Sequence, residues 1–338
     1  MRLTLTPYQL ELAHTFSISR ESHDFQDSLI VTLSHEGKSG YGEATANGYY
    51  QITSASMAKE IGLCKNQIEA HNFKTPELFY ELLSSLSLSN FSKCALDLAA
   101  WDLFGKINNT PLYKIWNTNL NNLATTNYTI GIDSVEKMVA KMIEKPWPIY
   151  KVKLGTSQDI DIVKALRAKT NAVFRIDANC AWEADETISN AQKLKDLGVE
   201  FIEQPLAADR WEDMKKVFDT SCLPLIADES CLIPEDVAKC VGHFHGINIK
   251  LTKCGGISPA LGMIKEAKAL GLKVMIGCMT ESSVGISAIG QLLPQLDYVD
   301  MDGALLLKKD IAKGIVIHED ASLSYPDMGG SGIELLDL

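Results

Sequence analysis

Three acidic residues stand at nearly constant intervals in the second half of the chain. Asp177, Glu203 and Asp228 are separated by 26 residues (177 to 203) and 25 residues (203 to 228). Carboxylates that converge on one place repel one another unless a cation lies among them, and a ligand set made only of oxygen suits Mg²⁺ or Mn²⁺. The spacing therefore predicts a divalent-metal site with these three ligands. Asn179 and Glu229 stand close by as secondary or supporting ligands.

Lysines precede and follow these acids in chain order. Lys151 and Lys153 come before Asp177, and Lys250 follows Asp228 by 22 residues (228 to 250). A nearby divalent cation and a second ammonium group both disfavour protonated lysine, which lowers its pKa from about 10.4 toward neutrality. One lysine could then remove a proton from the α-carbon of a carboxylate substrate while the metal stabilises the enediolate. A lysine on the opposite face could return a proton.

The elements that would position these residues repeat about every 25 residues from Asn127 onward. Short apolar, β-branched runs typical of strands occupy residues 127–132, 150–153, 173–177, 199–203, 225–228, 247–250, 273–277 and 298–302. Stretches of helical period lie between them at residues 159–169, 184–197, 234–241 and 260–270. Repeated strand–helix units build a parallel sheet, and eight of them close into a barrel.

The charged residues stand where these predicted strands end, and in a barrel such ends meet at one mouth. An open doubly wound sheet is the structural alternative. It is disfavoured because no Gly-x-Gly-x-x-Gly turn follows the first strand.

The first 120 residues or so have a different organisation. Strand-like runs occupy residues 3–12 and 28–35, a predicted glycine-rich turn follows at 37–42, and helical segments come next at 52–70, 76–84 and 93–108. Strands followed by helices indicate a separate α+β domain.

Composition narrows the class of protein. The chain has 338 residues, a formal net charge of −11 and 46% hydrophobic residues, which excludes a disordered chain. Nucleic acids and anionic membranes require clustered positive charge, which an acidic chain with scattered lysines and arginines lacks. The eight cysteines form no Cys-x-x-Cys pair, and the first residues have no signal-peptide core. We therefore expect a soluble, cytoplasmic protein with reduced thiols.

Five motifs carry a resemblance to a known family. YKVKLG, RIDANCAW, FIEQP, IADES and INIKLTKCGG resemble the muconate-lactonising subgroup of the enolase superfamily from about residue 127 to 302. YGEA at 41–44 resembles that superfamily's capping domain. The resemblance implies an α/β fold with a modified (β/α)8-type barrel, (β/α)7β, and an N-terminal α+β capping domain. The implied divisions are residues 1–123, residues 124–310 with the catalytic residues, and residues 311–338 packing back on the capping domain.

The resemblance also implies roles for the charged residues. Lys153 and Lys250 match the acid–base pair, with Lys151 in support, and Asp177, Glu203 and Asp228 match the Mg²⁺ ligands. A lysine base with Mg²⁺ is the general chemistry of that superfamily. The implied enzyme is an isomerase with one Mg²⁺ per subunit, replaceable by Mn²⁺. Because members of the superfamily often assemble, a homo-oligomer is compatible with it.

Two acids at the end of the last predicted strand bear on the substrate. Asp300 and Asp302 lie on the same side of a strand and form a compact negative site, which repels a succinyl group or a phosphate and suits an ammonium group. This Asp-x-Asp resembles that of dipeptide epimerases, where it holds the substrate's α-ammonium, and Thr129 matches a substrate-contacting threonine. The resemblance implies inversion of the α-carbon of the C-terminal residue in Ala-Xaa dipeptides with a free N-terminal amine.

The identity of Xaa depends on the capping domain. In Ala-Glu epimerases an arginine in a capping-domain loop meets the substrate's glutamate side chain. Counting from Phe16 to Ser28 puts Glu21 at that position, with Arg20 beside it. An acidic side chain would then meet like charge, so we expect Xaa to be small or hydrophobic.

Other functions stay open at this point. Within the subgroup they are L-Ala-D/L-Glu epimerase, N-succinylamino acid racemase and o-succinylbenzoate synthase. A Schiff-base aldolase would use one lysine and would not need three acids around it. A catalytically silent binding protein would have no use for lysines on both sides of the acids.

Overall fold

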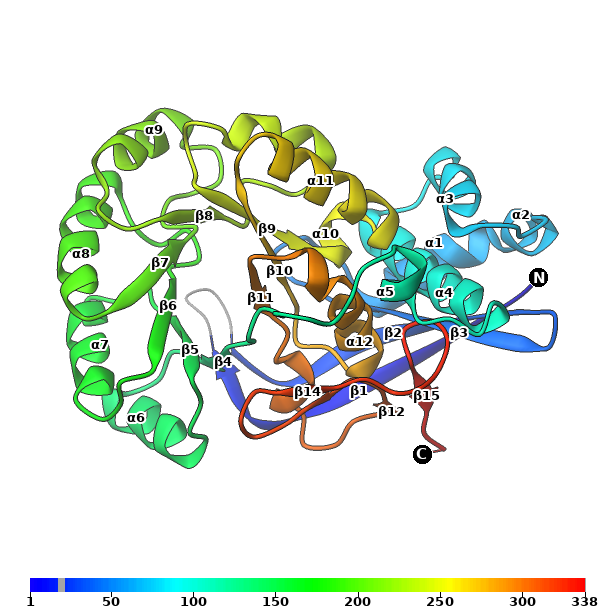
Figure 1. Cartoon of the computed structure of the whole chain (residues 1–338), viewed down its shortest axis with the longest axis horizontal. Coiled ribbons are helices and arrows are strands. Elements are labelled where there is room, and N and C mark those ends of the chain that lie inside the picture. The colour runs from blue at the N-terminus through cyan, green and yellow to red at the C-terminus, as the bar shows by residue number, and fades with distance from the viewer. Residues whose placement is uncertain (18–21, 338) are drawn as a thin grey trace.

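A computed structural model describes residues 1–17 and 22–337 of the chain. Its centre is an eight-stranded parallel sheet in which sequence neighbours are also neighbours in space, as a barrel of repeated strand–helix units requires (Figure 1). The strands are β4 (Tyr128–Ile130), β5 (Ile149–Lys153), β6 (Val173–Asp177), β7 (Val199–Glu203), β8 (Leu225–Ala227), β9 (Gly246–Lys250), β10 (Lys273–Gly277) and β11 (Tyr298–Asp300). The predicted barrel is confirmed.

The ring closes between its first and last strands by few contacts. Thr126 and Val299 form a single parallel bridge, and the backbone N–H of Met301 donates to Thr126 Oγ1 at 3.0 Å. Asn127 Nδ2 donates to the Asp300 carboxylate at 2.7 Å across the same line. Hydrogen bonds from the side chains of Thr126 and Asn127 therefore help to close the barrel between β4 and β11.

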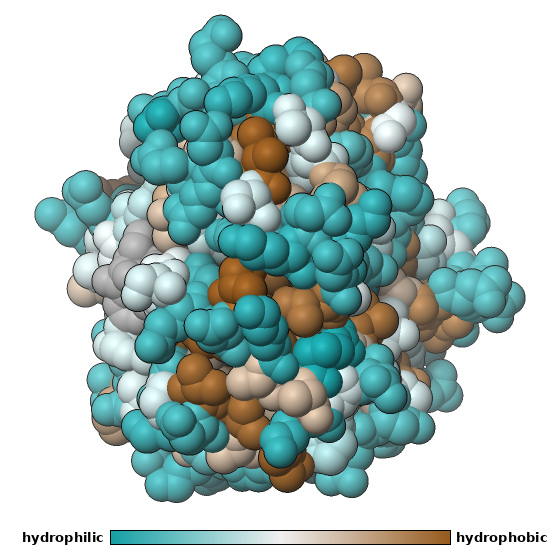
Figure 2. All heavy atoms as spheres, turned by 90° about the vertical axis from the view of Figure 1, so that its left-hand side faces the viewer, coloured by the Kyte–Doolittle hydropathy of each residue, from teal (hydrophilic) through white to brown (hydrophobic). Residues whose placement is uncertain are grey.

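Helices cover the outside of the barrel. They are α6 (Val135–Glu144), α7 (Asp159–Arg167), α8 (Ala184–Asp196), α9 (Trp211–Thr220), α10 (Leu251–Cys254), α11 (Ile257–Ala269) and α12 (Ser283–Leu292). In α6 the Ser134 side chain caps the N-terminus, while Met138 and Met142 are buried one turn apart. The outer face on the side of α6–α9 is mostly hydrophilic, with small hydrophobic patches (Figure 2).

The prediction of one continuous helix over residues 234–241 is wrong. The segment instead forms two short 3₁₀ helices, η1 (Pro234–Asp236) and η2 (Ala238–Cys240). The Asp236 carboxylate accepts from the backbone N–H groups of Leu232 and Ile233, which fixes a turn, and Gly242 at φ 76° follows. Another 3₁₀ helix, η4 (Gly303–Leu306), follows β11.

The N-terminal unit has an antiparallel sheet of β1 (Arg2–Ser17), β2 (Ser22–His35) and β3 (Lys38–Thr45). Five helices follow it: α1 (Ser54–Leu63), α2 (Lys65–Ala70), α3 (Pro76–Ser85), α4 (Asn90–Ile107) and α5 (Leu112–Ile115). In Figure 1 this unit lies beside the barrel at the right of the view.

The prediction of a glycine-rich turn over residues 37–42 is wrong. The turn itself is only Glu36–Gly37, both at positive φ, whereas Gly40 and Gly42 lie inside β3. A Cβ at Gly40 would lie 2.2 Å from the Ala99 carbonyl oxygen, and one at Gly42 would lie 2.1 Å from that of Ala95. These glycines therefore allow α4 to pack directly on the backbone of β3.

The last residues run along the N-terminal unit. This C-terminal segment contains two small antiparallel pairs, β12 (Ala312–Lys313) with β15 (Glu334–Leu335) and β13 (Val316–Ile317) with β14 (Leu323–Ser324). The backbone N–H of Ser331 donates to Asp102 Oδ1 at 2.9 Å, and Lys106 Nζ donates to the Ile333 carbonyl at 2.9 Å. Asp102 and Lys106 both belong to α4, so this helix contacts β3 as well as the C-terminal segment. Within residues 1–17 and 22–337, every helix is too short or too polar to span a lipid bilayer.

Candidate active site

The residues predicted to do chemistry gather at the C-terminal ends of the barrel strands. Lys153, Asp177 and Glu203 are adjacent in register across β5, β6 and β7. Asp228 directly follows β8, and Lys250 ends β9. Of these, Lys153, Asp228 and Lys250 line a cavity of about 420 Å³ between the barrel and the N-terminal unit, within the size range of small-molecule sites.

The three predicted metal ligands lie together and are buried. One carboxylate oxygen from each of Asp177, Glu203 and Asp228 comes within 4.8 Å of the others, which is close enough for one ion to touch all three. Burial, and secondarily Asp177, raises the pKa of Glu203 to about 7. Burial also acts to raise the pKa of Asp177, but the ammonium groups of Lys153 and Lys151 outweigh it and lower the value to about 2. This all-oxygen donor set fits Mg²⁺.

Lys153 and Lys250 approach the triad from opposite sides. Lys153 Nζ lies 2.6 Å from Asp177 Oδ2, and Lys250 Nζ lies 2.9 Å from Asp228 Oδ2. Their strands, β5 and β9, are four places apart in a ring of eight. Burial would lower the pKa of Lys250, but Asp228 raises it overall. A bound cation would compete with Lys250 for Asp228 Oδ2. Because Lys250 would then lose its ion pair and face a positive charge, we expect its pKa to be lower when the metal is bound.

Lys151 occupies the centre of the acidic groups. Its Nζ lies 2.7 Å from Asp300 Oδ2, 2.9 Å from Glu203 Oε2 and 3.2 Å from Asp177 Oδ2. Burial disfavours its charge, but Asp300 and the other carboxylates outweigh that cost and raise its pKa well above the usual value. Lys151 is therefore a fixed positive charge rather than a group ready to lose its proton.

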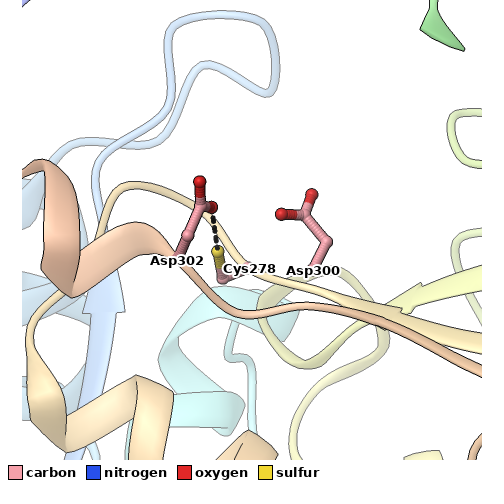
Figure 3. Close-up of side chains that lie close together, drawn as sticks. All are labelled: Cys278, Asp300 and Asp302. Carbon is pink, nitrogen blue, oxygen red and sulfur yellow. Dashed lines mark hydrogen bonds between the residues drawn. The ribbon is translucent and has the colours of Figure 1, made fainter. Parts of the chain in front are cut away.

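The Asp300–Asp302 pair rises side by side from the end of β11 into the cavity, with Cys278 between them (Figure 3). Asp302 Oδ2 accepts from the backbone N–H of Thr129 at 2.5 Å, and the Cys278 thiol donates to Asp302 Oδ1 at 4.0 Å. Burial and then Asp300 raise the pKa of Asp302 well above its usual value. Lys151 overcomes burial and lowers that of Asp300. The pKa values of the two acids therefore shift in opposite directions although they share one strand end.

Two family models cover almost the whole chain. "Mandelate racemase / muconate lactonizing enzyme, N-terminal domain" matches residues 2–116, and "Enolase C-terminal domain-like" matches residues 134–337. The chain belongs to the enolase superfamily. The resemblance identified from the motifs is thereby confirmed, and so is the type of fold that it implied.

Members of the superfamily that are similar to this chain include named epimerases. The L-Ala-D/L-amino acid epimerase of Maribacter sp. is 65% identical over 99% of both chains, and that of Flavobacterium johnsoniae is 58% identical over 99% of this chain and all of that one. Among solved structures, the dipeptide epimerase from Enterococcus faecalis, complexed with Mg and L-Leu-L-Tyr, superposes with a TM-score of 0.92. It is 31% identical and matches over 98% of each chain.

The wall contributed by the N-terminal unit carries no lysine or arginine in the part of the chain that the structure describes. It includes the aromatic side chains Phe16 and Phe25, His23 and one acid, Asp27. The predicted positions of Glu21 and Arg20 lie outside the described residues. Thr129, expected to meet the substrate, lines the same cavity.

The sequence alone indicated no role for two residues that contact the predicted metal ligands, Asn248 and Lys253. Asn248 Nδ2 donates to Glu203 Oε1 at 2.8 Å, and Lys253 Nζ donates to both the carboxylate and the carbonyl oxygen of Asp228. The alternation of a strand gave a signal for Asn248, because residues two apart, such as Asn248 and Lys250, face the same side. Lys253 follows β9, where no periodicity indicates which way a side chain turns.

Proposed function

We propose that this protein is an Mg²⁺-dependent dipeptide epimerase that inverts the α-carbon of the C-terminal residue in Ala-Xaa dipeptides. The observation that carries the proposal is the placement of Lys153 and Lys250 on opposite sides of three buried carboxylates. An epimerase needs one proton acceptor and one proton donor on opposite faces of a carbon, and this arrangement provides both. The relatives at 65% and 58% identity, named L-Ala-D/L-amino acid epimerases, support it.

The chain's own residues divide the work. Asp177, Glu203 and Asp228 would hold Mg²⁺, which when bound supplies positive charge beside the substrate carboxylate and stabilises the negative charge left by proton removal. The neutral amine of one lysine takes the α-proton at its Nζ. The protonated Nζ of the other delivers a proton to the opposite face of the same carbon. One C–H bond breaks and one forms, so the substrate changes only its configuration.

The acid pair and the wall would select the substrate. Asp300 and Asp302 suit a free N-terminal ammonium, and they disfavour the extra carboxylate of an N-succinylamino acid or of o-succinylbenzoate. The aromatic groups Phe16 and Phe25 and the acid Asp27 suit a small or hydrophobic Xaa better than glutamate. L-Ala-D/L-Glu epimerase is therefore the less favoured alternative. We expect Mn²⁺ to replace Mg²⁺ because it accepts the same oxygen ligands, and the homo-oligomer stays a prediction.

Deuterium incorporation tests the proposal directly. L-Ala-L-Xaa dipeptides with Xaa as Ala, Val, Phe and Glu are incubated with the protein and Mg²⁺ in D₂O and then analysed by mass spectrometry. We expect one deuterium at the second residue, greatest for Ala, Val and Phe, and none in N-succinylamino acids. Exchange confined to N-succinylamino acids would move the assignment to a racemase. A protein equally active after EDTA treatment would refute the metal triad.

A further inference from the structure

The two carboxylate oxygens of Asp228 have different partners. Its Oδ1 accepts from Lys253 Nζ, which also donates to the Asp228 backbone carbonyl at 2.7 Å. Its Oδ2 faces Lys250 Nζ on the cavity side at 2.9 Å. Lys253 is only 3% exposed, and such a buried ammonium is tolerated only when oxygens surround it. The buried ammonium group of Lys253 therefore keeps its hydrogen bond to Oδ1 and fixes the orientation of the Asp228 carboxylate.

Glu203 is held in the same way by a neutral group. Its Oε1 accepts from Asn248 Nδ2 at 2.8 Å, and Asn248 is fully buried on β9. Lys151 Nζ lies 2.9 Å from Oε2 and 3.1 Å from Oε1, so it faces both oxygens from the cavity side. The amide of Asn248 thus distinguishes two carboxylate oxygens that Lys151 alone would not.

Asp177 completes the pattern with a backbone donor. Its Oδ1 accepts from the N–H of Asn179 at 2.9 Å, and its Oδ2 lies 2.6 Å from Lys153 Nζ. Asn179 adopts φ 44°, a left-handed conformation that is uncommon outside glycine, just after the strand end. The backbone bend there places an amide N–H against the metal-ligand candidate.

We propose that these three donors, the Asn179 N–H, the Asn248 amide and the Lys253 ammonium, make each carboxylate bind through one oxygen and thereby select Mg²⁺ over Ca²⁺. The inference rests on the metal triad of the proposed function. Mg²⁺ requires near-octahedral geometry with short bonds and keeps several waters, whereas Ca²⁺ takes six to eight oxygens and readily accepts bidentate carboxylates. Three oxygens from three residues leave three positions of an octahedron for water and substrate. Asn248 and Lys253 are positioning residues, because each acts through its carboxylate.

Cation affinities of the metal-free protein test the proposal without using activity. Titration calorimetry with Mg²⁺ and with Ca²⁺ compares the wild type, Asn248→Leu and Lys253→Met. Lys239→Met is the control, because Lys239 is exposed and pairs only with Asp236 at 2.8 Å among the described contacts. Supporting groups of this kind typically change metal affinity by about 10–100-fold. We expect Mg²⁺ affinity to fall by about that factor and Ca²⁺ affinity to fall less, so that their ratio drops roughly tenfold, with no change in the control.

The ratio of Mg²⁺ to Ca²⁺ affinity separates the effect of carboxylate orientation from the effect of removing a positive charge. Removing the Lys253 ammonium also removes a repulsive positive charge, but that effect favours both divalent ions to the same extent. Equal changes in both affinities, or an unchanged Mg²⁺ affinity in Asn248→Leu, would overturn the proposal.

Infrared difference spectra of the wild type keep the proposal testable if neither variant folds. Carboxylates that bind through one oxygen show widely separated antisymmetric and symmetric stretches, and bidentate carboxylates show closely spaced ones. We expect the wide separation when Mg²⁺ binds, and bidentate bands would refute the inference. No Mg²⁺ binding at all would refute the triad itself. Mg²⁺ binding without epimerisation would instead refute only the substrate assignment.

Discussion

Replacing Asp302 by asparagine should weaken dipeptide binding while leaving the fold and the metal site intact. Burial and Asp300 raise the pKa of Asp302, which favours its protonated form, and asparagine imitates that form in shape and hydrogen bonding. Its amide oxygen can still accept from the backbone N–H of Thr129, which Asp302 binds at 2.5 Å. What asparagine cannot supply is a negative charge for the substrate ammonium.

The size of the effect follows from that single lost charge. A hydrogen bond between charged groups contributes about 1.5–3 kcal/mol, and about 1.4 kcal/mol is tenfold in affinity, so KM should rise roughly 10- to 150-fold. Steady-state kinetics with L-Ala-L-Val measure KM, and calorimetry measures the Mg²⁺ affinity, which should stay unchanged.

The pH dependence gives an independent check on Asp302. Its proton must leave before the carboxylate can meet an ammonium group, so the KM of the wild type should fall as pH rises through the raised pKa of Asp302. The Asp302→Asn variant should lack that dependence. An unchanged KM in the variant, or a loss of Mg²⁺ affinity in parallel with substrate affinity, would refute the ammonium role.

Other consequences of the structure can be measured separately. Lys153→Ala and Lys250→Ala should each abolish epimerisation but keep deuterium exchange from one configuration of Xaa, a different one in each variant; loss of both exchanges in each variant would contradict one lysine per face. Glu281 is buried and its pKa is raised to about 8, chiefly by burial, so its ionisation destabilises the fold as pH rises from about 4.5 to 8, by on the order of 5 kcal/mol at most. Glu281→Gln should therefore flatten the dependence of Tm on pH over that range, and an unaltered slope would count against the assignment. Gly42→Ala should lower stability by about 1–3 kcal/mol or more, because its Cβ would lie 2.1 Å from a helix carbonyl. Gly62→Ala, on the open side of α1, should raise stability by about 0.5–1 kcal/mol, and equal Tm shifts would contradict the packing argument.

The sequence predicted the barrel well because its buried parallel strands are short runs of β-branched residues. Six of the eight runs end in a charged residue that cannot remain buried without a partner, as Lys153, Asp177 and Glu203 show. Local pattern and chemistry therefore coincide at the strand ends. The division of the chain at residues 123 and 310 stays a prediction.

Features that depend on distant partners were not predictable. Gly40 and Gly42 read as a turn, but what requires glycine there is the backbone of α4, more than 50 residues away in sequence. Asn248 and Lys253 stand in a motif that the sequence singled out. Their importance depends on which oxygen of Glu203 or Asp228 they hold, and only the folded arrangement determines that.

The closure of the barrel has a consequence for how such an enzyme can change its substrate over evolution. Asp300 binds Asn127, and Asp302 binds the backbone of Thr129, so both acids also tie the last strand to the first. A mutation that replaces either aspartate with a residue unable to accept these hydrogen bonds should loosen the ring as well as the recognition of an amine. Cys278 and Leu306 line the same cavity without holding the seam. We therefore expect new preferences for the first residue of a dipeptide to arise at these two positions, and the proposed requirement for a free amine to persist with the architecture.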